Sequence, residues 1–413
     1  MPSFEVTVLQ NAGRYLLRIE SPQIGQYQSA LDQQALSEAA RGLNAQVRLD
    51  ENALADYGKA LFQTLFDQQA QAAFQAARLI AYQQGEPLAF VLRLPTESLL
   101  HDIAWELLHN GKEFLVRDGR LTFGRYLEQA APVQSLALQP PLRILLTTAQ
   151  PTDQALLNLD SEVQLIQEAL SDLRQKVTLV IKKNVDFGQL QHTLLRGRNI
   201  GAPFHVWHHC GHGDMTEDGQ FILALYRGGG SEYVYGSQLS LLAAQCPELR
   251  LAVLNVCYSG APSGLAAQFA ALNVPATIGF RAAIRDSAAL KFANALYSAL
   301  PYVPVEEAVA QARLQLAAAY PYDDPRRTDW TLPILFLRAR QSRLFADTQT
   351  SLPQQSTAQA SQVSKAQGGT IHIGEAIVGG DANISQHGGA RLHISKIKVK
   401  GDANITQGDE EVN

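Results

Sequence analysis

Two short segments of the chain place histidine, cysteine and glycine where they could carry out nucleophilic catalysis. Each follows an apolar run typical of a buried strand: FHVWHHC at 204–210 leads into His212 and Gly213, and RLAVLNV at 250–256 leads into Cys257. A thiol next to an imidazole base is an effective nucleophile, because the base removes the proton from the sulfur. The pattern therefore predicts His212 as a general base and Cys257 as a nucleophile.

The backbone at these positions could also stabilise the negative charge that forms on a carbonyl oxygen under attack. Gly213 has no side chain, so its N–H can approach a bound carbonyl closely. Together with the N–H of Cys257 it is predicted to form an oxyanion hole, in which each donor contributes about 3 kcal/mol. We also expect the neighbouring His212 to lower the pKa of the Cys257 thiol toward neutral pH.

Other roles for these residue types remain open. A cysteine at the end of an apolar strand is often just a small buried hydrophobe, and Cys246 and Cys210 are interpreted in this way. A zinc site is a second alternative, although structural zinc usually takes four ligands from two paired elements, and the second half is absent unless Cys257 takes part. We expect no metal and no other cofactor. The residues considered as zinc ligands are His205, His208, His209, Cys210 and His212.

Length and composition narrow the class of protein. The 413 residues, 46% of them hydrophobic and 18% charged, are typical of a globular chain with two or three domains. A net charge of −5 argues against a basic nucleic-acid-binding surface. Three cysteines cannot form a disulfide framework, the first residues lack a signal-peptide pattern, and the apolar runs are too short for a membrane span. The sequence predicts a cytoplasmic protein without nucleic-acid or membrane partners.

The elements that must position the two motifs follow from the hydrophobic periodicity. From residue 139 to 340, apolar strand-like runs alternate with helical segments. This alternation predicts an α/β fold with a mostly parallel central sheet and helices on both faces. Sites in such sheets lie beyond the carboxyl ends of the strands, so both motifs should meet at one edge.

The first third of the chain has a different pattern. Residues 1–52 are predicted to form a β-rich extension, and helical spacing of apolar residues predicts a helix over about 53–84. A second helix is expected over 98–111, and the Asp118-Gly119 pair predicts a hairpin over 112–126. We expect 53–340 to form one domain with an N-terminal half (53–138) and a catalytic half (139–340).

The end of the chain contains a polar linker and an internal repeat. Residues 341–368 are rich in Gln, Ser, Thr and Ala, which indicates a flexible linker. Within 369–413, the segments 371–386 and 392–407 align with nine identities in sixteen positions, and each has the alternation of a short β element. Since two repeats bury little surface alone, this tail is expected to stack with copies of itself, to dock on the main domain, or to be disordered.

Taken in order, these motifs resemble those of the CHAT domain, a family related to caspases and separases. The family pattern H-x-x-G-H-G is matched at 208–213 and L-x-x-C-x-S-G at 254–260, while 104–108 resembles P-W-E-L-L with Ala in the place of Pro. The resemblance covers about residues 53–338. Further downstream, single positions match the family at Asp286, Ala289, Phe292, Tyr297, Leu300, Ala308, Ala312, Arg313, Trp330 and Pro333.

The resemblance implies a caspase-like fold and a cysteine endopeptidase that hydrolyses a protein or peptide substrate through an acyl-enzyme, with His212 as base and Cys257 as nucleophile. In related metacaspases an acidic residue two positions before the cysteine helps to bind a basic side chain. Asn255 stands there in this chain, so a preference for Arg or Lys is not implied. Asp286 could supply the charge or could cap a helix, and both residues are candidate substrate contacts. Trp105 and Glu106 are interpreted as packing and hydrogen-bonding residues.

The tail in turn resembles the amyloid-type signalling motifs of microbial immune effectors and fungal prion-forming proteins. This resemblance implies that residues 369–413 self-assemble or bind an upstream partner, and that the protein acts in bacterial defence or programmed cell death. The physical basis would be edge-to-edge strand pairing with Asn and Gln ladders. The alternative is a catalytically silent CHAT scaffold that serves as a protein-interaction module.

Overall fold

The computed structural model divides the chain into two compact units, a main unit (Met1–Thr348) and a tail unit (Gln349–Asn413). In the tail unit it describes the backbone of six short strands. Among all described residues, no helix is both long and apolar enough to cross a membrane. In the main unit the described residues are 2–11, 14–22, 25–42, 50–95, 99–117, 119–127, 135–272, 274–321, 324–338 and 342–345.

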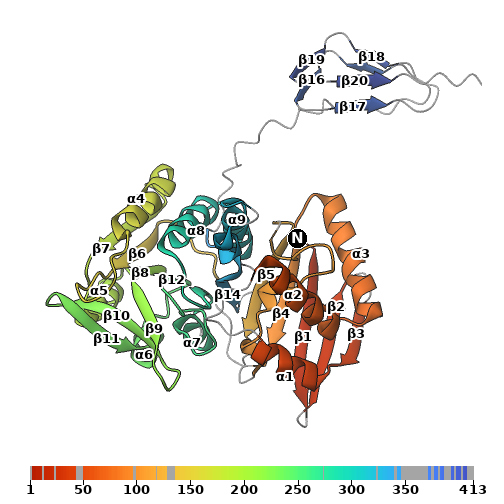
Figure 1. The fold of residues 1–413 in the computed structure, drawn as a ribbon. Helices are drawn as coiled ribbons and strands as arrows, with labels where there is room; N and C mark the ends of the chain where they lie inside the picture. The colour runs from red at the N-terminus through yellow and green to blue at the C-terminus, as the bar shows by residue number, and fades with distance from the viewer. Residues whose placement is uncertain are drawn as a thin grey trace, which may run out of the picture. The chain divides into compact units, whose positions relative to one another are not determined.

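An eleven-stranded sheet runs through the main unit in the order β3-β2-β1-β4-β5-β14-β13-β12-β8-β6-β7 (Figure 1). Neighbouring strands are parallel except for β1/β2, β2/β3 and β13/β14. The predicted α/β class with a mostly parallel sheet is therefore confirmed. The strands are β1 (Ser3–Asn11), β2 (Arg14–Ser21), β3 (Gly25–Ala30), β4 (Leu88–Leu94), β5 (Leu121–Leu127), β6 (Leu142–Thr148), β7 (Val177–Lys182), β8 (Val206–Cys210), β12 (Leu251–Asn255), β13 (Ala276–Phe280) and β14 (Pro333–Leu337).

Helices cover both faces of this sheet, because its strands are apolar on both sides. In β12, Leu251 and Val253 belong to one apolar cluster, and Ala252 and Leu254 belong to a second one on the opposite face. The first cluster includes side chains of α2, α3, α4, α8 and α9, and the second includes those of α5, α6 and α7. The helices are α1 (Gln33–Gly42), α2 (Glu51–Leu65), α3 (Gln68–Gln84), α4 (Leu159–Ala169), α5 (Phe187–Asn199), α6 (Gly236–Ala244), α7 (Leu265–Ala271), α8 (Asp286–Ala299) and α9 (Val305–Ala318).

The N-terminal residues join the same sheet, since β1 pairs with β4 in parallel and places Phe4 opposite Phe90. The helix predicted over 53–84 is in fact two helices, α2 and α3. The break lies at Asp67, whose side chain accepts a hydrogen bond from the N–H of Ala70 and so caps a new helix.

The helix predicted over 98–111 is not formed, and two 3₁₀ turns (Leu99–His101 and Trp105–Leu107) take its place. The reason is a buried arginine from β5. Arg125 donates to the main-chain carbonyls of His101 (2.9 Å) and Ile103 (3.0 Å), which in a helix would accept from the helix itself. Arg125 also pairs with buried Glu106 at 2.6 and 3.0 Å, so Glu106 has the hydrogen-bonding role expected of it.

The hairpin predicted over 112–126 is also wrong. The strand β5 is a central strand with parallel neighbours on both sides, β4 and β14, so no edge is left for a hairpin partner. Phe114 instead pairs with His109 in an isolated antiparallel β-bridge. Asp118 of the predicted turn lies outside the described residues.

The chain after β14 returns to the core before the tail. Leu344 and Phe345, which the composition placed in the polar linker, are buried, and the N–H of Leu138 donates to the carbonyl of Leu344. Residues 346–368 of the predicted linker lie outside the described residues.

In the tail unit each repeat, predicted to be a short β element, forms three short strands. The strands of the first repeat pair in parallel with those of the second at the repeat offset, so that Ile371 lies opposite Leu392 and Ala382 opposite Ala403. The strands are β15 (Ile371–Ile373), β16 (Ala376–Gly379), β17 (Ala382–Ser385), β18 (Leu392–Ile394), β19 (Ile397–Lys400) and β20 (Ala403–Thr406).

Candidate active site

The two strands that end in the motifs are neighbours in the sheet. β8 and β12 pair in parallel with Cys210 opposite Asn255, so their carboxyl ends meet at one edge. The loop to His212 leaves the first strand at this edge, and the loop to Cys257 leaves the second. The carboxyl edge of the sheet thus brings together residues that are 45 positions apart in sequence.

Between these strands the chain forms a separate three-stranded antiparallel sheet of β9 (His212–Met215), β10 (Phe221–Arg227) and β11 (Gly230–Tyr235). Its first strand packs closely on the cysteine loop. A Cβ atom on Gly213 would lie 2.8 Å from the carbonyl oxygen of Cys257 and 3.1 Å from the ring of Phe221. Only glycine therefore fits at this position, and its backbone directly approaches the loop that carries Cys257.

His212 is oriented by a main-chain carbonyl. Its Nε2 lies 2.8 Å from the carbonyl oxygen of Ala155. Since a carbonyl can only accept, Nε2 must carry the proton, and in the neutral ring Nδ1 is then free to accept one. The same carbonyl also accepts from the side chain of Gln150 at 3.0 Å. The sequence does not point to Ala155, because a carbonyl oxygen has no residue-type signature.

Cys257 is half-buried, and its Sγ lies 3.9 Å from the carbonyl oxygen of Ile284. Burial raises the pKa of the thiol, the hydrogen bond to Ile284 opposes this rise, and the negative charge of Asp214 adds to it. Among the hydrogen bonds of the described residues, none joins Cys257 to His212. The expected lowering of the thiol pKa by His212 is therefore not observed, because the imidazole proton is directed to Ala155 and the thiol to Ile284.

The turn after the cysteine is held in a strained shape. Tyr258 has φ +60°, in the left-handed region that non-glycine residues rarely adopt. The hydroxyl of Ser259 lies within 2.8–2.9 Å of the carbonyls of Leu254 and Val256 and accepts from the N–H of Phe280 at 3.0 Å. These bonds explain the serine of the motif as a structural residue that fixes the loop of Cys257.

The glycine that follows is explained in the same way. A Cβ on Gly260 would lie 2.8–2.9 Å from backbone atoms of Gly279 in the neighbouring strand β13. The Ser-Gly pair of the motif therefore closes the loop onto the sheet.

The two candidate substrate contacts occupy different surroundings. Asn255 is only 4% exposed, and its side-chain N–H donates to Glu162 and to the carbonyl of Ala289. Asp286 accepts from the N–H of Asn158 at 3.3 Å. It is the first residue of α8, whose cap is Arg285, so its alternative assignment as a helix N-cap is wrong.

Below this edge lies a buried polar cluster that sequence reasoning only partly foresaw. Donor atoms of Glu162, His208 and Cys210 lie within 4.8 Å of one another, a set that could hold a metal ion. His208 donates through Nε2 to Glu162 (3.0 Å) and accepts through Nδ1 from Tyr297 (3.1 Å). Cys210 also hydrogen-bonds Glu162. These bonds among protein groups satisfy the cluster without an ion.

The other histidines considered as zinc ligands have hydrogen-bond partners outside this cluster. His209 contacts the hydroxyl of Thr147 at 2.8 Å, and burial lowers its pKa to about 3. His205 accepts from the N–H of Arg143 through Nδ1. The predicted zinc set thus shares only His208 and Cys210 with the observed cluster.

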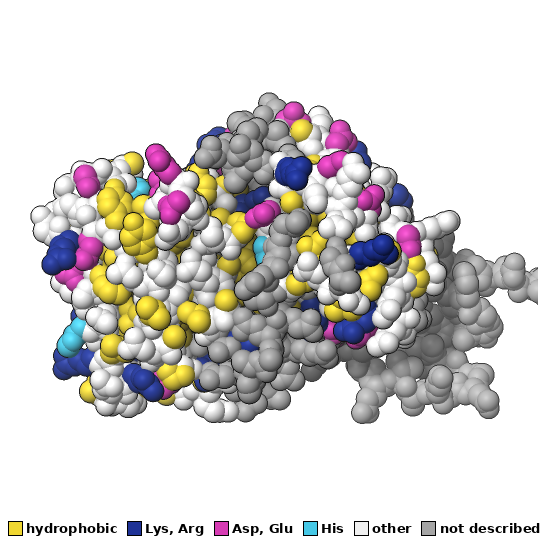
Figure 2. Space-filling view, turned by 90° about the horizontal axis from the view of Figure 1, so that it is seen from below, with side chains coloured by type: hydrophobic (Ala, Val, Ile, Leu, Met, Phe, Trp, Pro, Cys, Tyr) yellow, Lys and Arg dark blue, Asp and Glu magenta, His cyan; other side chains and the backbone are white. Residues whose placement is uncertain are grey.

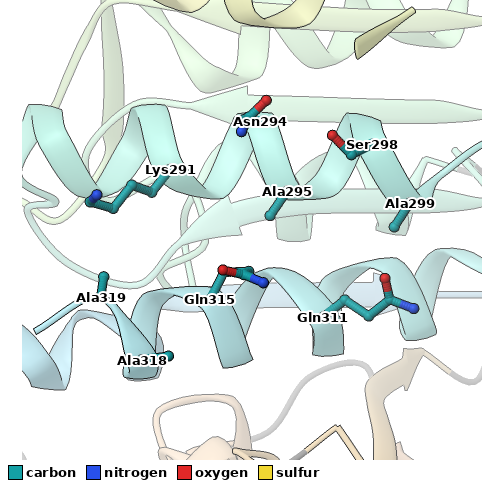
Figure 3. Close-up of a pocket in the computed structure, with 9 residues that line it drawn as sticks. All are labelled: Lys291, Asn294, Ala295, Ser298, Ala299, Gln311, Gln315, Ala318 and Ala319. Atoms are coloured by element: carbon teal, nitrogen blue, oxygen red, sulfur yellow. The ribbon is translucent and has the colours of Figure 1, made fainter. Parts of the chain in front are cut away.

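A groove of about 530 Å³ lies between α8 and α9 (Figure 3). It is lined by polar side chains such as Asn294, Ser298, Gln311 and Gln315, and by small alanines. It contains neither of the two predicted catalytic residues.

A family model described as "CHAT domain" matches residues 55–363. No curated protein matches the chain. Among solved structures, similar chains include the Saccharomyces cerevisiae separase–securin complex (12% identity, TM-score 0.45, covering 81% of this chain and 30% of that chain). A second is a secreted C11 cysteine protease from Bacteroides thetaiotaomicron in complex with an irreversible peptide inhibitor (13% identity, TM-score 0.31, covering 44% of this chain and 62% of that chain). A third is the Drosophila initiator caspase Dronc (12% identity, TM-score 0.35, covering 50% of this chain and 84% of that chain). The chain thus spans less than two thirds of the first two of these proteins.

Proposed function

Because this chain belongs to the CHAT domain family, we propose that it is a cysteine endopeptidase that hydrolyses peptide bonds of a protein substrate. The observation that carries the proposal is the close packing of the two motif loops at one sheet edge. Gly213 packs against the carbonyl of Cys257, and His212 is oriented by Ala155 in the tautomer that a base requires.

In the proposed reaction, Nδ1 of His212 accepts the thiol proton as Sγ of Cys257 attacks the substrate carbonyl carbon. The N–H groups of Gly213 and Cys257 hold the oxygen on which negative charge develops. His212 then donates the proton to the leaving amine as the C–N bond breaks, and water hydrolyses the thioester. The thiol must first turn from the carbonyl of Ile284 toward the imidazole.

Asn255 and Asp286 are the proposed substrate contacts. The side-chain oxygen of Asn255 is buried without a hydrogen-bond partner, while its N–H group is held by Glu162. An unsatisfied buried acceptor costs free energy that a donor from the substrate would recover. This supports Asn255 as an acceptor for a polar side chain of the substrate.

The tail is proposed to self-assemble or to bind an upstream partner, in a cytoplasmic protein of bacterial defence or programmed cell death. The parallel pairing of its two repeats at equal offsets supports self-assembly, because a second copy could continue the same pairing at either open edge.

The test is a peptide-library cleavage assay with the purified full chain, Cys257→Ala and His212→Ala. Cys246→Ala is the matched control, since Cys246 lies in the core after α6. Cleavage should be lost in both site variants and retained in the control. If Cys257→Ala cuts the same peptides at the wild-type rate, the proposal is wrong.

A second candidate function is a silent scaffold. It is favoured by the raised pKa of the Cys257 thiol and by its bond to Ile284 instead of His212. A thiol-reactive peptide electrophile separates the two: labelling of Cys257 supports the peptidase, and failure to label it in both the full chain and a chain without 369–413 supports the scaffold.

A further inference from the structure

Glu162 is a buried carboxylate that takes no part in the proposed reaction. Figure 2 shows Asp and Glu side chains at the surface of one face, several of them beside Lys or Arg. Glu162 is instead only 3% exposed, and among the ion pairs of the described residues its one partner is His208. Burying a carboxylate without a Lys or Arg partner costs free energy, and the hydrogen bonds that Glu162 accepts must offset this cost.

Three donors from two neighbouring strands converge on this carboxylate. His208 and Cys210 of β8 donate to it through Nε2 and the thiol, and Asn255 of β12 donates to it through Nδ2. Glu162 itself belongs to α4. The bond to Asn255 therefore ties a helix to the end of the strand from which the loop of Cys257 leaves.

These contacts fix the orientation of the Asn255 amide. Its Nδ2 contacts the carboxylate of Glu162 and, at 3.4 Å, the main-chain carbonyl of Ala289. A carbonyl and an ionised carboxylate can only accept hydrogen bonds. Turning the amide over would place Oδ1 against two acceptors, so the nitrogen must lie on this side. Oδ1 lies on the other side, where it is buried without a hydrogen-bond partner.

We propose that Glu162 is a positioning residue that holds the amide of Asn255 with Oδ1 toward the substrate, so that the substrate side chain bound there must be a hydrogen-bond donor. Amide, ammonium and guanidinium groups meet this requirement, and a carboxylate is repelled. The inference rests on the proposed contact between Asn255 and the substrate. It deepens that contact by naming the chemical class that is accepted and the residue that enforces the choice.

The side chain concerned belongs to the residue whose carbonyl is attacked. Asn255 stands two residues before Cys257, at most about 7 Å of extended chain. A side chain such as Gln spans this distance together with its own hydrogen bond. Asn255 is only 4% exposed, so water does not compensate a substrate group that fails to match Oδ1, and discrimination should be strong.

The test compares two peptides that differ only at this residue, with Gln in one and Glu in the other. The two side chains have nearly the same shape, but Gln can donate a hydrogen bond and ionised Glu cannot. At pH 7 the wild-type chain should prefer the Gln peptide about 100-fold or more in kcat/KM, since a negative charge beside a buried acceptor is rejected. Both peptides are assayed on one preparation, so the folded fraction cancels from the ratio.

Glu162→Gln offers Asn255 an N–H as well as a carbonyl, so the Asn255 amide can turn over. The preference for the Gln peptide should then fall about 10-fold, because the orientation of one hydrogen bond is no longer enforced. Asn255→Ala should also lose the preference, and adding Glu162→Gln to it should change the ratio no further, because Glu162 acts through Asn255. A merely structural role would lower both rates and leave their ratio unchanged. The matched control is Glu168→Gln, an exposed carboxylate on the same helix that accepts from Gln164.

The proposal is overturned if the wild-type chain cuts both peptides equally well, or if Glu162→Gln keeps the wild-type ratio. A ratio that Asn255→Ala leaves unchanged rejects the Asn255 contact and the proposal with it. Failure of the peptidase function gives a different result, namely no cleavage of either peptide. Binding of the same fluorescent peptides to the Cys257→Ala chain then measures the preference, and equal affinities for the Gln and Glu peptides reject the proposal.

Discussion

Cys257 and His212 each direct a proton to a main-chain carbonyl, Sγ to Ile284 and Nε2 to Ala155. The first contact directs the thiol to a carbonyl instead of the imidazole, and the second leaves Nδ1 of the neutral imidazole free to accept a proton. Burial and the charge of Asp214 raise the pKa of the thiol. A protonated thiol is a poor nucleophile. In this arrangement no hydrogen bond links the thiol to the imidazole, although the sequence motif suggests that the thiol gives its proton to His212. A substrate that displaces the thiol from Ile284 would allow this proton transfer.

The first prediction concerns the reactivity of the thiol. Because burial and the charge of Asp214 raise the pKa of Cys257, its alkylation by iodoacetamide should still be accelerating above the pH at which an ordinary thiol is half ionised, about 8.5. Asp214→Asn removes one of the causes and should move the profile to lower pH. The measurement is the rate of alkylation of the Cys257 peptide by mass spectrometry.

The matched control for this experiment is Asp218→Asn. Asp218 is an exposed carboxylate in the turn between β9 and β10, where it accepts hydrogen bonds from Thr216 and Gln220. It is not among the groups that shift the pKa of the Cys257 thiol. A profile that Asp214→Asn leaves unchanged would contradict the electrostatic account.

At the scale of elements, the site depends on the approach of β9 to the loop after β12. Gly213→Ala would place a Cβ 2.8 Å from the carbonyl of Cys257. Since displacements of about 1 Å can cost 100-fold in rate, we expect kcat to fall by about that factor. Gly230→Ala is the control, because its Cβ would meet nothing closer than 3.9 Å. Equal activity in the two variants would show that the approach is not needed.

A second element-scale prediction concerns the buried pair between the 3₁₀ turn and β5. Burial raises the pKa of Glu106, but the charge and hydrogen bonds of Arg125 outweigh this, and the pKa is lowered overall. Glu106→Gln leaves Arg125 buried without its counter-charge and should lower the free energy of unfolding by about 3–5 kcal/mol at pH 7. Urea denaturation measures this difference.

The sign of the pH dependence follows from the lowered pKa. The contribution of ionised Glu106 to the free energy of unfolding is complete above the ordinary pKa of a glutamate, about 4.3. This contribution is lost as the pH falls through the lower pKa that Glu106 has in the folded protein. The difference between wild type and Glu106→Gln should therefore shrink in acid. The control is Glu113→Gln, which breaks a partly exposed pair with Arg78 and should cost about 1 kcal/mol or less.

At the scale of the whole molecule, the chain combines a main unit that contains the complete candidate site with a tail unit of two paired repeats. We predict that deletion of 369–413 abolishes large species in light scattering and leaves the circular dichroism and thermal midpoint of the main unit unchanged. A tail of the same composition in scrambled order is the control and should behave like the deletion. Unchanged particle size after deletion would argue against self-assembly.

Sequence alone determined the properties that depend on local pattern. The alternation of apolar runs indicated a parallel sheet, the motifs placed His212 and Cys257 at strand ends, and the alternation within each repeat indicated the short β elements of the tail. These inferences succeed because periodicity and spacing act within one element or between identical ones.

Only the tertiary structure decided which groups meet. The helix expected at 98–111 is replaced because Arg125, from a later strand, takes its carbonyls, and the hairpin at 112–126 fails because β14 joins β5 from more than 200 residues away. The thiol and the imidazole are partnered by main-chain carbonyls, those of Ile284 and Ala155, which every residue type possesses. Such contacts are set by the path of the backbone through space, and no side-chain pattern encodes them.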